Sequence, residues 1–381
     1  MDKIKNKKLL SPDKYLLSVV FLLIAFGLIM LFSASLAVAQ SNFGDPYHYI
    51  RGQIFGLILG LFLFLFFYRV DYRFFKKYSL SFLILSLILL TLVFVPGLRN
   101  DYGNSYSWIV IFGQSIQVSE IVKLSFLFYL AGWLESRKDE LKAVSTGIIP
   151  FLTVLSLIAF LLLKQPDLGT FLMIGFIAFM VYMVAGGNFS HLFFIFLILA
   201  IAVLSVFNTI NSGEDSRVFR SYQADRIKCL QDPSYDRDVC YQVNQAMIAA
   251  GSGGIFGVGL GESRQKFNYL PEVWADSIFP IIAEEIGFIG SFLLILIYFY
   301  IFIKGMIIAS RAPDLFGKSL ATGISVWIFF QAFLNIGGMI NLIPMTGVPL
   351  PFVSAGGTSL FMLLAAFGVL INISRQTYEK K

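Results

Sequence analysis

Three carboxylates stand at the edge of an apolar stretch or inside it. Asp276 comes just before the stretch, and Glu284 and Glu285 lie within it, in the segment LPEVWADSIFPIIAEEIG (270–287). A carboxylate in a bilayer costs roughly 2.5 kcal/mol or more, so it persists where a partner or water receives it. All three are therefore candidate functional residues. Neighbouring residues on a helix point about 100° apart, so at most one glutamate shares the face of Asp276, and a buried hydrogen-bonding role is expected for the glutamates.

A second charged group stands at the start of another apolar stretch, at the end of the segment GLRNDYGNSYSWIVIFGQSIQVSEIVK (97–123). Glu120 and Lys123 are three residues apart, so on a helix they share a face and can form an ion pair. Two interpretations stay open. The pair either lets both charges enter the bilayer, or it holds a cationic Lys123 toward a cavity that binds an anionic group. Trp108, in the same segment, suits the aromatic belt of a membrane interface.

A glycine-rich run precedes the three carboxylates. The segment NQAMIAAGSGGIFGVGLGESRQKFNYLPE (244–272) has six glycines between positions 251 and 261, and Ser252 and Gly253 lie where the run begins. Such a run directs backbone N–H groups toward a phosphate in many sites, and it equally marks a tight re-entrant turn. Arg226 and Lys266 are cations on the same loop, which favours a phosphate-bearing ligand.

The last polar segment, NLIPMTGVPLPFVSAGGTS (341–359), is rich in proline and glycine at membrane depth. Irregular backbone there is tolerated only where protein buries it or where it lines a wet cavity. We therefore expect Ser354, Gly356 and Gly357 in the wall of a cavity.

Two cysteines, Cys229 and Cys240, fall in one loop. On the oxidising side of a membrane we expect them to form a disulfide, and the alternative is two free thiols. A zinc site is disfavoured because the two histidines of the chain, His48 and His191, are far from the cysteines in sequence. No metal motif and no cofactor motif is identified.

The composition predicts the fold class. Hydrophobic residues make up 57% of the 381 residues and charged residues 14%, which no soluble domain of this size needs for its core. We expect an all-α polytopic membrane protein, a single domain over 1–381, with about ten spans of ~20 residues and one large extracytoplasmic loop at about 210–275. The expected spans are 15–39, 52–69, 78–96, 119–134, 147–163, 170–186, 191–209, 276–306, 319–340 and 356–373.

The 29 Lys and Arg residues predict the orientation, because short cytoplasmic loops carry the excess of positive charge. With the N-terminus inside, 18 of them fall on the cytoplasmic side, and the short external loops receive Arg51, Arg99 and Lys164. Both termini are therefore expected in the cytoplasm, and the first apolar segment is expected to remain a span rather than a cleaved signal peptide. The net charge of +6 fits attraction to anionic membrane lipid and is not interpreted as nucleic-acid binding.

Several of these segments together resemble the SEDS family of bacterial peptidoglycan polymerases, and its division branch (FtsW) more than its elongation branch (RodA). The resemblance covers nearly every expected span in order, and GLGESRQKFNYLPE favours the division branch. The segments that carry it are GLIMLFSAS, YRVDYRFFKKYS, SIQVSEIVKLSFLFYLA, KQPDLGT, YQVNQAMIAAGSGGIFGVGLGESRQKFNYLPEVWADSIFPIIAEEIGFIG and TGVPLPFVSAGGTSLFMLLAAFGVLINISR.

The resemblance implies a ten-helix glycosyltransferase that polymerises lipid II at the outer face of the bacterial cytoplasmic membrane during cell division. It implies two kinds of protein partner, a class B penicillin-binding protein that acts as the transpeptidase and other division proteins. The aspartate that the family is held to use in catalysis corresponds to Asp276. The family's Ser-Glu-x-x-Lys segment and its loop Trp correspond to Ser119, Glu120, Lys123 and Trp108, and its loop Arg corresponds approximately to Arg226.

This chain departs from the family pattern at several positions, five of which replace a polar or aromatic residue of the family. The segment PEVWADSIFP stands where a segment similar to PEAHTDFIFA is usual, and the other departures are a lost Arg before the loop Trp and a lost Tyr in the last external segment. The residues found at these positions are Trp274, Ala275, Ser277, Ser107 and Ala355. Asp276 is retained, so the catalytic assignment is retained, whereas any role of the lost His or Arg in lipid II binding is in doubt.

The implied reaction joins a sugar hydroxyl of one lipid II to the anomeric carbon of a lipid-linked chain. Asp276 is the expected general base. Lowered dielectric and a neighbouring Glu272 or Glu284 are expected to raise its pKa, and a nearby cation is expected to oppose this. Lys123, Arg226, Lys266 or the glycine amides are expected to stabilise the departing pyrophosphate, and a divalent cation is compatible with this chemistry. Two other functions stay open. A lipid II flippase requires functional polar groups at mid-membrane and toward the cytoplasm, and a non-catalytic scaffold for the transpeptidase tolerates neutralisation of Asp276.

Overall fold

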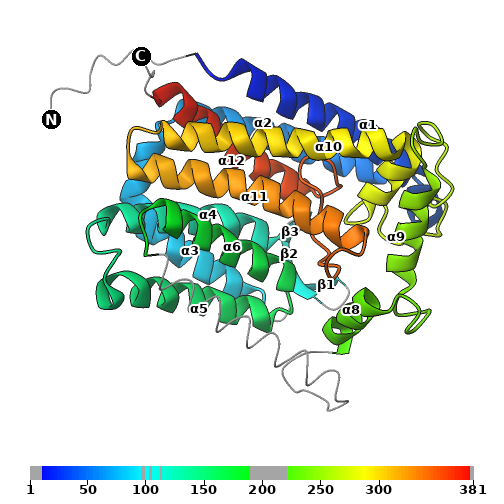
Figure 1. Ribbon diagram of the computed structural model, residues 1–381, viewed down its shortest axis with the longest axis horizontal. Helices are drawn as coiled ribbons and strands as arrows, with labels where there is room; N and C mark the ends of the chain where they lie inside the picture. Colours follow the sequence, from blue (N-terminus) through cyan, green and yellow to red (C-terminus); the bar gives the residue numbers. More distant parts are fainter. Residues whose placement is uncertain (1–10, 96–98, 103–104, 112–113, 189–220, 378–381) are drawn as a thin grey trace.

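The computed structural model describes residues 11–95, 99–102, 105–111, 114–188 and 221–377. Most of these residues are helical, and the long helices lie side by side in one bundle (Figure 1). The helices are α1 (Lys14–Phe43), α2 (His48–Arg69), α3 (Ser79–Leu92), α4 (Val118–Ser136), α5 (Ile149–Lys164), α6 (Leu168–Val184), α8 (Ser221–Gln231), α9 (Tyr241–Ser252), α10 (Ile278–Ser310), α11 (Leu315–Met339) and α12 (Gly357–Gln376). A 3-10 helix (Tyr72–Tyr78) precedes α3, and one π-helical turn (Val144–Ile148) precedes α5.

Among the described residues, seven helical segments are long and apolar enough to cross a membrane. They are α1, α2, the 3-10 helix joined to α3, the π turn joined to α5, α10, α11 and α12. Helix α6 is apolar but shorter, and α4 carries the charges of Glu120 and Lys123. A helix of the structure therefore lies at each expected span except 191–209, which falls outside the described residues.

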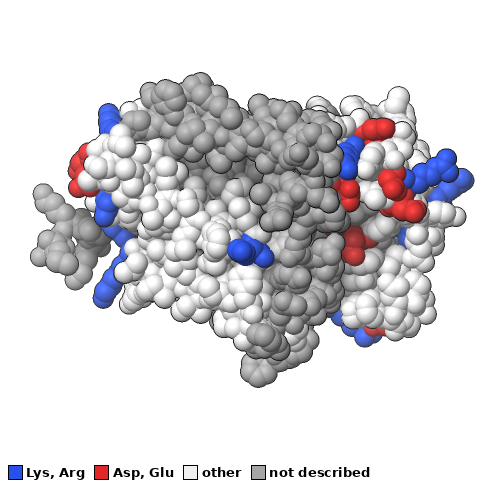
Figure 2. Space-filling view, turned by 90° about the horizontal axis from the view of Figure 1, so that it is seen from below, with Lys and Arg blue, Asp and Glu red and all other residues white. Residues whose placement is uncertain are grey.

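Ion pairs join the helices at one end of the bundle. Arg73 Nε lies 2.7 Å from Asp314 Oδ2, and Lys304 Nζ lies 3.3 Å from Asp13 Oδ2. Figure 1 shows the start of α1 and the end of α12 at this end, whereas α8 and α9 lie at the opposite end. In the view of Figure 2 the charged side chains gather at the two ends, and a mostly uncharged band lies between them. This distribution is typical of a protein that spans a bilayer.

A small antiparallel sheet, which the sequence analysis did not anticipate, leads into α4. Strands β1 (Arg99–Tyr102), β2 (Ser105–Ile111) and β3 (Gln114–Gln117) pair in that order, with Trp108 opposite Gln117. The sheet ends where α4 begins, at Val118. The described strands of this segment thus form a small sheet beside the start of α4.

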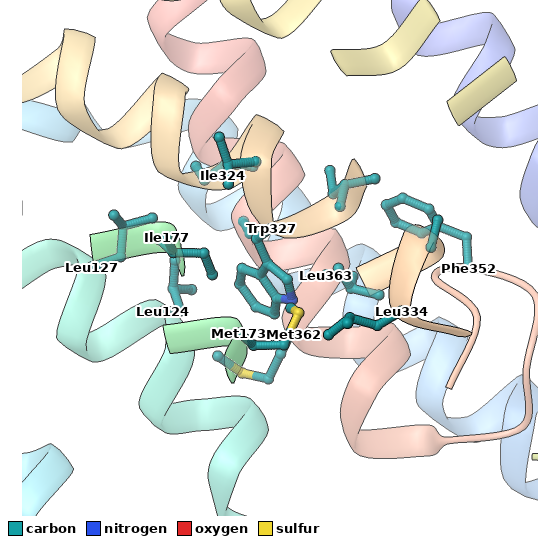
Figure 3. Close-up of a cluster of buried hydrophobic side chains, with 14 of the residues drawn as sticks. Leu124, Leu127, Met173, Ile177, Ile324, Trp327, Leu334, Phe352, Met362 and Leu363 are labelled. Atoms are coloured by element: carbon teal, nitrogen blue, oxygen red, sulfur yellow. The ribbon is translucent and has the colours of Figure 1, made fainter. Parts of the chain in front are cut away.

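The centre of the bundle is a buried cluster around the indole of Trp327 on α11. Side chains from α4, α6 and α12 surround the indole, as Figure 3 shows, among them Leu127, Ile177 and Leu363. Helices α11 and α12 are buried along most of their length, whereas α2 and α10 expose many apolar side chains. The burial of two predominantly apolar helices by their neighbours identifies them as the core of the membrane domain.

The described part of the loop that we expect to be external, from residue 221 to α10, folds as two helices and an irregular segment. A disulfide joins Cys229 at the end of α8 to Cys240 just before α9, with a Cα–Cα distance of 5.4 Å. After α9 the chain runs without regular structure to α10, which begins at Ile278. Asp276 therefore lies in this connection, two residues before the helix, and not in the span expected to start there.

Helix α10 is interrupted at Gly287, where φ is +71° and ψ is −171°. Carbonyl groups freed by this break accept hydrogen bonds from the preceding loop, since Val258 N–H donates to the carbonyl of Glu284 at 3.0 Å. The fit is close, because a methyl group added at Gly287 would lie 2.2 Å from the backbone nitrogen of Gly257. Glycine is required at Gly287 both for its left-handed φ and for this approach.

We expect Gly287→Ala to destabilise the protein, by about 1–3 kcal/mol as is usual for overpacking. Gly251→Ala is the matched control, because a methyl group at Gly251 would meet no atom within 4 Å. Thermal unfolding of the purified variants in detergent measures the difference. Equal midpoints for the two variants would contradict the close packing of the loop into the α10 break.

Candidate active site

Asp276 is buried at the end of the bundle where α8 and α9 lie, with 8% of its surface exposed. Its backbone carbonyl accepts a hydrogen bond from Asn335 Nδ2 of α11 at 2.7 Å, so the residue is fixed to the core. Its side-chain atom Oδ1 has no hydrogen-bond partner among the described residues. A buried carboxylate oxygen in this state is available to a substrate hydroxyl.

Arg226 of α8 lies beside Asp276. A methyl group added at Gly347 would lie 3.7 Å from Asp276 Oδ2 and 3.8 Å from Arg226 Nη2, so both side chains flank this glycine. Arg226 is held there by a hydrogen bond of 2.6 Å from Nη1 to the carbonyl of Met345. The structure thus brings together two of the predicted site residues that are 50 positions apart in sequence.

Burial raises the pKa of Asp276 to about 6, although the Arg226 guanidinium and nearby backbone N–H groups lower it. Surrounding protein atoms and the charge of Asp276 raise the pKa of Glu272 to about 7, while part of the Glu272 side chain stays open to solvent. A carboxylate with a pKa near 6 is mostly ionised at neutral pH and is a stronger base than an ordinary aspartate. These are properties expected of a general base.

A second polar centre surrounds Lys123 of α4. Lys123 Nζ lies 2.8 Å from Glu120 Oε1 and 3.0 Å from Gln331 Oε1, and it stands 4.8 Å from the centroid of the Trp327 ring system. Both charged side chains are 2% exposed. The predicted ion pair between Glu120 and Lys123 is therefore present, and it is buried against α11.

Helix α11 connects the two polar centres. Gln331 accepts from Lys123 and donates through Nε2 to the carbonyl of Pro349 at 2.9 Å. One turn further, Asn335 Nδ2 donates to the carbonyls of Val348 and Asp276, at 2.8 and 2.7 Å. The sequence analysis did not single out these two amides. The signal was present as two uncharged polar residues four positions apart in an apolar span.

The segment between α11 and α12, residues 341–356, is irregular and enters the interior. Several of its carbonyls accept hydrogen bonds from side chains on different helices. Tyr298 OH of α10 donates to Pro351, and Gln53 Nε2 of α2 donates to Ser354. Ser354 Oγ also accepts from the amide of Leu350. This segment is the irregular backbone that the sequence predicted at membrane depth, and here protein buries it.

Gly356 and Gly357 begin α12 against α2. The amide of Gly356 donates to Gln53 Oε1 at 3.1 Å. A methyl group at Gly56 of α2 would lie 2.7 Å from the Cα of Gly357, so the two helices approach closely there. This close approach requires glycine at position 56, whereas a methyl group at Gly356 or Gly357 would make only ordinary contacts, 3.4 Å from Ser359 Cβ and 3.7 Å from the carbonyl oxygen of Gly52.

Lys266 is buried away from Asp276 in an ion pair. Its Nζ lies 2.9 Å from Glu285 Oε1 and 3.0 Å from Ser33 Oγ of α1. The neighbouring Glu284 accepts hydrogen bonds from Ser263 Oγ and from the backbone of residue 264. Both glutamates therefore fix the loop to α10, as their expected hydrogen-bonding role requires, and the ammonium of Lys266 already has an anionic partner.

The glycine-rich run forms a tight turn against α10. A methyl group at Gly253 would lie 2.0 Å from the carbonyl oxygen of Ala283, and the amides of Val258 and Gly259 donate to α10 carbonyls. Ser252, by contrast, is exposed at the end of α9. These two amides are thus engaged within the protein, which favours the re-entrant turn over the phosphate nest.

Two departures from the family pattern meet near Asp276. The ring system of Trp274 stacks on Tyr49 of α2, with 4.6 Å between centroids. The carbonyl of Trp274 accepts a hydrogen bond from the amide of Ala355 at 2.7 Å. A third departure, Ser107, donates to Asp167 Oδ2 at 3.1 Å on the strand that carries Trp108. The substituted positions therefore have defined contacts in this chain.

Metal ligands do not gather at either polar centre. Among the described residues, no group of three or more His, Cys, Asp or Glu side chains could hold a metal ion. The charges that the described part of the chain places near Asp276 belong to Arg226 and Glu272.

Relatives of this chain match it over nearly its whole length. The family model FtsW/RodA/SpoVE, described as cell cycle protein, matches residues 13–379. The probable peptidoglycan glycosyltransferase FtsW of Trichlorobacter lovleyi is 36% identical over 371 residues, which cover 97% of this chain and 95% of that protein. Stage V sporulation protein E of Bacillus subtilis is 37% identical, with 96% of this chain and 97% of that protein covered.

Solved structures are similar as well. A chain from work on "structural coordination of polymerization and crosslinking by a peptidoglycan synthase complex" is 26% identical, has a TM-score of 0.77, and is covered completely by 97% of this chain. The Rod shape determining protein RodA of Thermus thermophilus, also 26% identical, has a TM-score of 0.68, with 97% and 99% of the two chains covered. The predicted helical membrane architecture and the SEDS resemblance are thereby confirmed, and this chain is an integral membrane protein that belongs to the FtsW/RodA/SpoVE family of cell cycle proteins.

Proposed function

We propose that Asp276 is the general base of this chain, which is a peptidoglycan glycosyltransferase like the relatives that it matches. The observation that carries the proposal is a buried carboxylate with a raised pKa and an unpartnered oxygen, held by Asn335 beside Arg226. The substrate is lipid II, and the reaction takes place at the outer face of the bacterial cytoplasmic membrane during cell division.

In this reaction a sugar hydroxyl of one lipid II attacks the anomeric carbon of the lipid-linked glycan chain. Asp276 accepts the hydroxyl proton, a carbon–oxygen bond forms, and the bond from the anomeric carbon to the pyrophosphate breaks. A positioned base contributes typically 10²–10⁴-fold to such a step. Arg226, next to Asp276, is suited to stabilise the negative charge on the departing pyrophosphate. Inversion at the anomeric carbon requires no protein nucleophile.

Lys123 is assigned an indirect role. Its ammonium is buried and bonded to Glu120 and Gln331, and Gln331 in turn holds Pro349 of the segment beside Asp276. The positive charge thus supports the position of the site and the electrostatic potential near it, without direct substrate contact.

The orientation follows from charge. Basic residues such as Arg73, Lys304 and Arg375 lie at the end of the bundle where α1 begins and α12 ends. Because short cytoplasmic loops carry the positive excess, this end faces the cytoplasm and both termini lie there. Asp276, at the opposite end, then faces the compartment in which the glycan is built.

A class B penicillin-binding protein is the partner we propose, together with other division proteins and with membrane lipid as the surrounding phase. The support is a likeness to a chain from a peptidoglycan synthase complex whose description couples polymerization to crosslinking. A polymerase that delivers strands to a transpeptidase in the same complex explains that coupling.

The two alternatives differ from the enzyme in where function resides. A flippase needs functional polar groups from the middle of the membrane to the cytoplasm, whereas Asp276, Arg226 and Glu272 gather at the external end. A scaffold needs no catalytic carboxylate and leaves the burial of the Asp276 carboxylate without a purpose. The placement of these groups therefore favours the enzyme.

We expect Asp276→Asn to lower polymerisation of labelled lipid II by at least 10²-fold, since the base is lost. The assay uses the purified chain with its transpeptidase, and the exposed Asp238→Asn is the matched control. Burial raises the Asp276 pKa, so ionisation of this carboxylate destabilises the folded protein as pH rises through about 6. The asparagine of the variant stays uncharged, so the variant should melt no earlier than wild type at pH 7.5. Equal glycan yields from Asp276→Asn and wild type would remove Asp276 from the mechanism, whereas no glycan from either protein would favour the flippase or the scaffold.

The pH dependence of kcat/KM provides a separate test. Protonation of Asp276 removes the base, so the rate should fall as pH drops through about 6. Arg226 lowers the Asp276 pKa, so Arg226→Gln should move this acid limb to higher pH. An acid limb at the same pH in both proteins would show that Asp276 does not titrate under the influence of Arg226.

A further inference from the structure

The loop between α9 and α10 exposes an apolar tip. Residues 251–261 contain no charged side chain. Four of them are exposed and apolar: Ile255 by 61%, Phe256 by 81%, Val258 by 45% and Leu260 by 63%. Contact of this much apolar surface with water is unfavourable, by about 25 cal/mol for each Å². A contiguous exposed patch of this kind marks an interaction surface.

Backbone hydrogen bonds fix the tip to one level of α10. Val258 N–H donates to the carbonyl of Glu284 at 3.0 Å, and Gly259 N–H donates to the carbonyl of Glu285 at 3.1 Å. In the other direction, Phe288 N–H donates to the carbonyl of Gly254 at 2.9 Å. The tip therefore lies beside the break in α10, six to eleven residues inside the helix.

The length of the exposed apolar face of α10 indicates how deep the break in this helix lies in the bilayer. Apolar side chains are exposed along it from Phe288 (67%) through Phe299 (48%) to Ile307 (39%). Ile307 lies 19 residues after Phe288, which corresponds to about 28 Å at ~1.5 Å per residue. The hydrocarbon core of a bilayer is about 30 Å thick, so Phe288 stands at its outer edge. The tip, hydrogen-bonded at Phe288, lies at the same edge.

The interior side of the loop is anchored strongly enough to hold this position. Lys266 and Glu285 form a buried ion pair, and Lys266 also donates a hydrogen bond to Ser33 of α1. The close fit of Gly257 and Gly287 leaves no space for a side chain at either position. The same loop continues to Asp276. Its apolar tip and its catalytic end are thus parts of one rigid connection.

We propose that residues 254–260 form a membrane-inserted loop whose apolar side chains contact lipid acyl chains of the outer leaflet. The contact surface is continuous with the lipid-facing side of α10, which begins at Phe288. The inference concerns lipid contact and holds independently of the reaction assigned to Asp276. A second protein chain on the same surface is the competing occupant.

Site-directed spin labelling distinguishes these occupants. Both native cysteines are bonded to each other, so Phe256→Cys supplies a single reactive thiol in the full chain. The labelled protein is placed in nanodiscs of phosphatidylethanolamine and phosphatidylglycerol, and its collision rates with oxygen and with a water-soluble nickel chelate are compared. Phe299→Cys on the lipid face of α10 and Asp238→Cys in the external loop are the reference positions.

We expect the label at position 256 to resemble the label at position 299, with at least a threefold preference for oxygen over the nickel chelate relative to position 238. Nickel accessibility equal to that at position 238 would place the tip in water and overturn the proposal. Low accessibility to both reagents would show a protein partner or a second copy over the tip, and would overturn it as well.

Discussion

The structure depends on one constraint: an irregular backbone segment inside a membrane protein must find hydrogen-bond partners within the protein. Residues 341–356 enter the bundle without regular structure, and side chains from several helices donate to their carbonyls. Gln53, Tyr298, Gln331 and Asn335 supply these donors from α2, α10 and α11. An unpaired carbonyl at this depth would cost several kcal/mol, so the donors and the segment specify each other.

The same constraint positions the site. The side-chain amide of Asn335 donates one hydrogen bond to the buried segment and one to the backbone carbonyl of Asp276. Arg226 donates to the carbonyl of Met345 in the same segment. The carboxylate therefore gains its place from groups that satisfy backbone, while its own Oδ1 stays without a partner among the described residues. Burial then makes the carboxylate a better base than it would be in water. The ionised carboxylate of Asp276 is thus less stable in the folded protein than in water, and it is a stronger base.

Sequence reasoning was most successful where a signal is local. Apolar runs predicted the long helices of the bundle but not α8 and α9 of the loop. The unusual placement of a charge in an apolar context marked Asp276 and the Glu120–Lys123 pair. It was least successful where the meaning of a residue depends on a distant partner. The role of Lys266 is set by Glu285 and by α1, and the glycine run could be read as a phosphate nest because nothing local shows the break at Gly287. The sheet before α4 likewise rests on pairings that composition does not reveal.

The central claim is that Asn335 couples the buried segment to the base. Asn335→Asp keeps the shape of the side chain but removes the amide donor to Asp276 and Val348, and Asn42→Asp makes the same change on an exposed residue. The direct measurement is kcat and KM for lipid II polymerisation by both folded variants. The account predicts that kcat falls at least tenfold for Asn335→Asp and is unchanged for Asn42→Asp. Wild-type kcat in Asn335→Asp would contradict it.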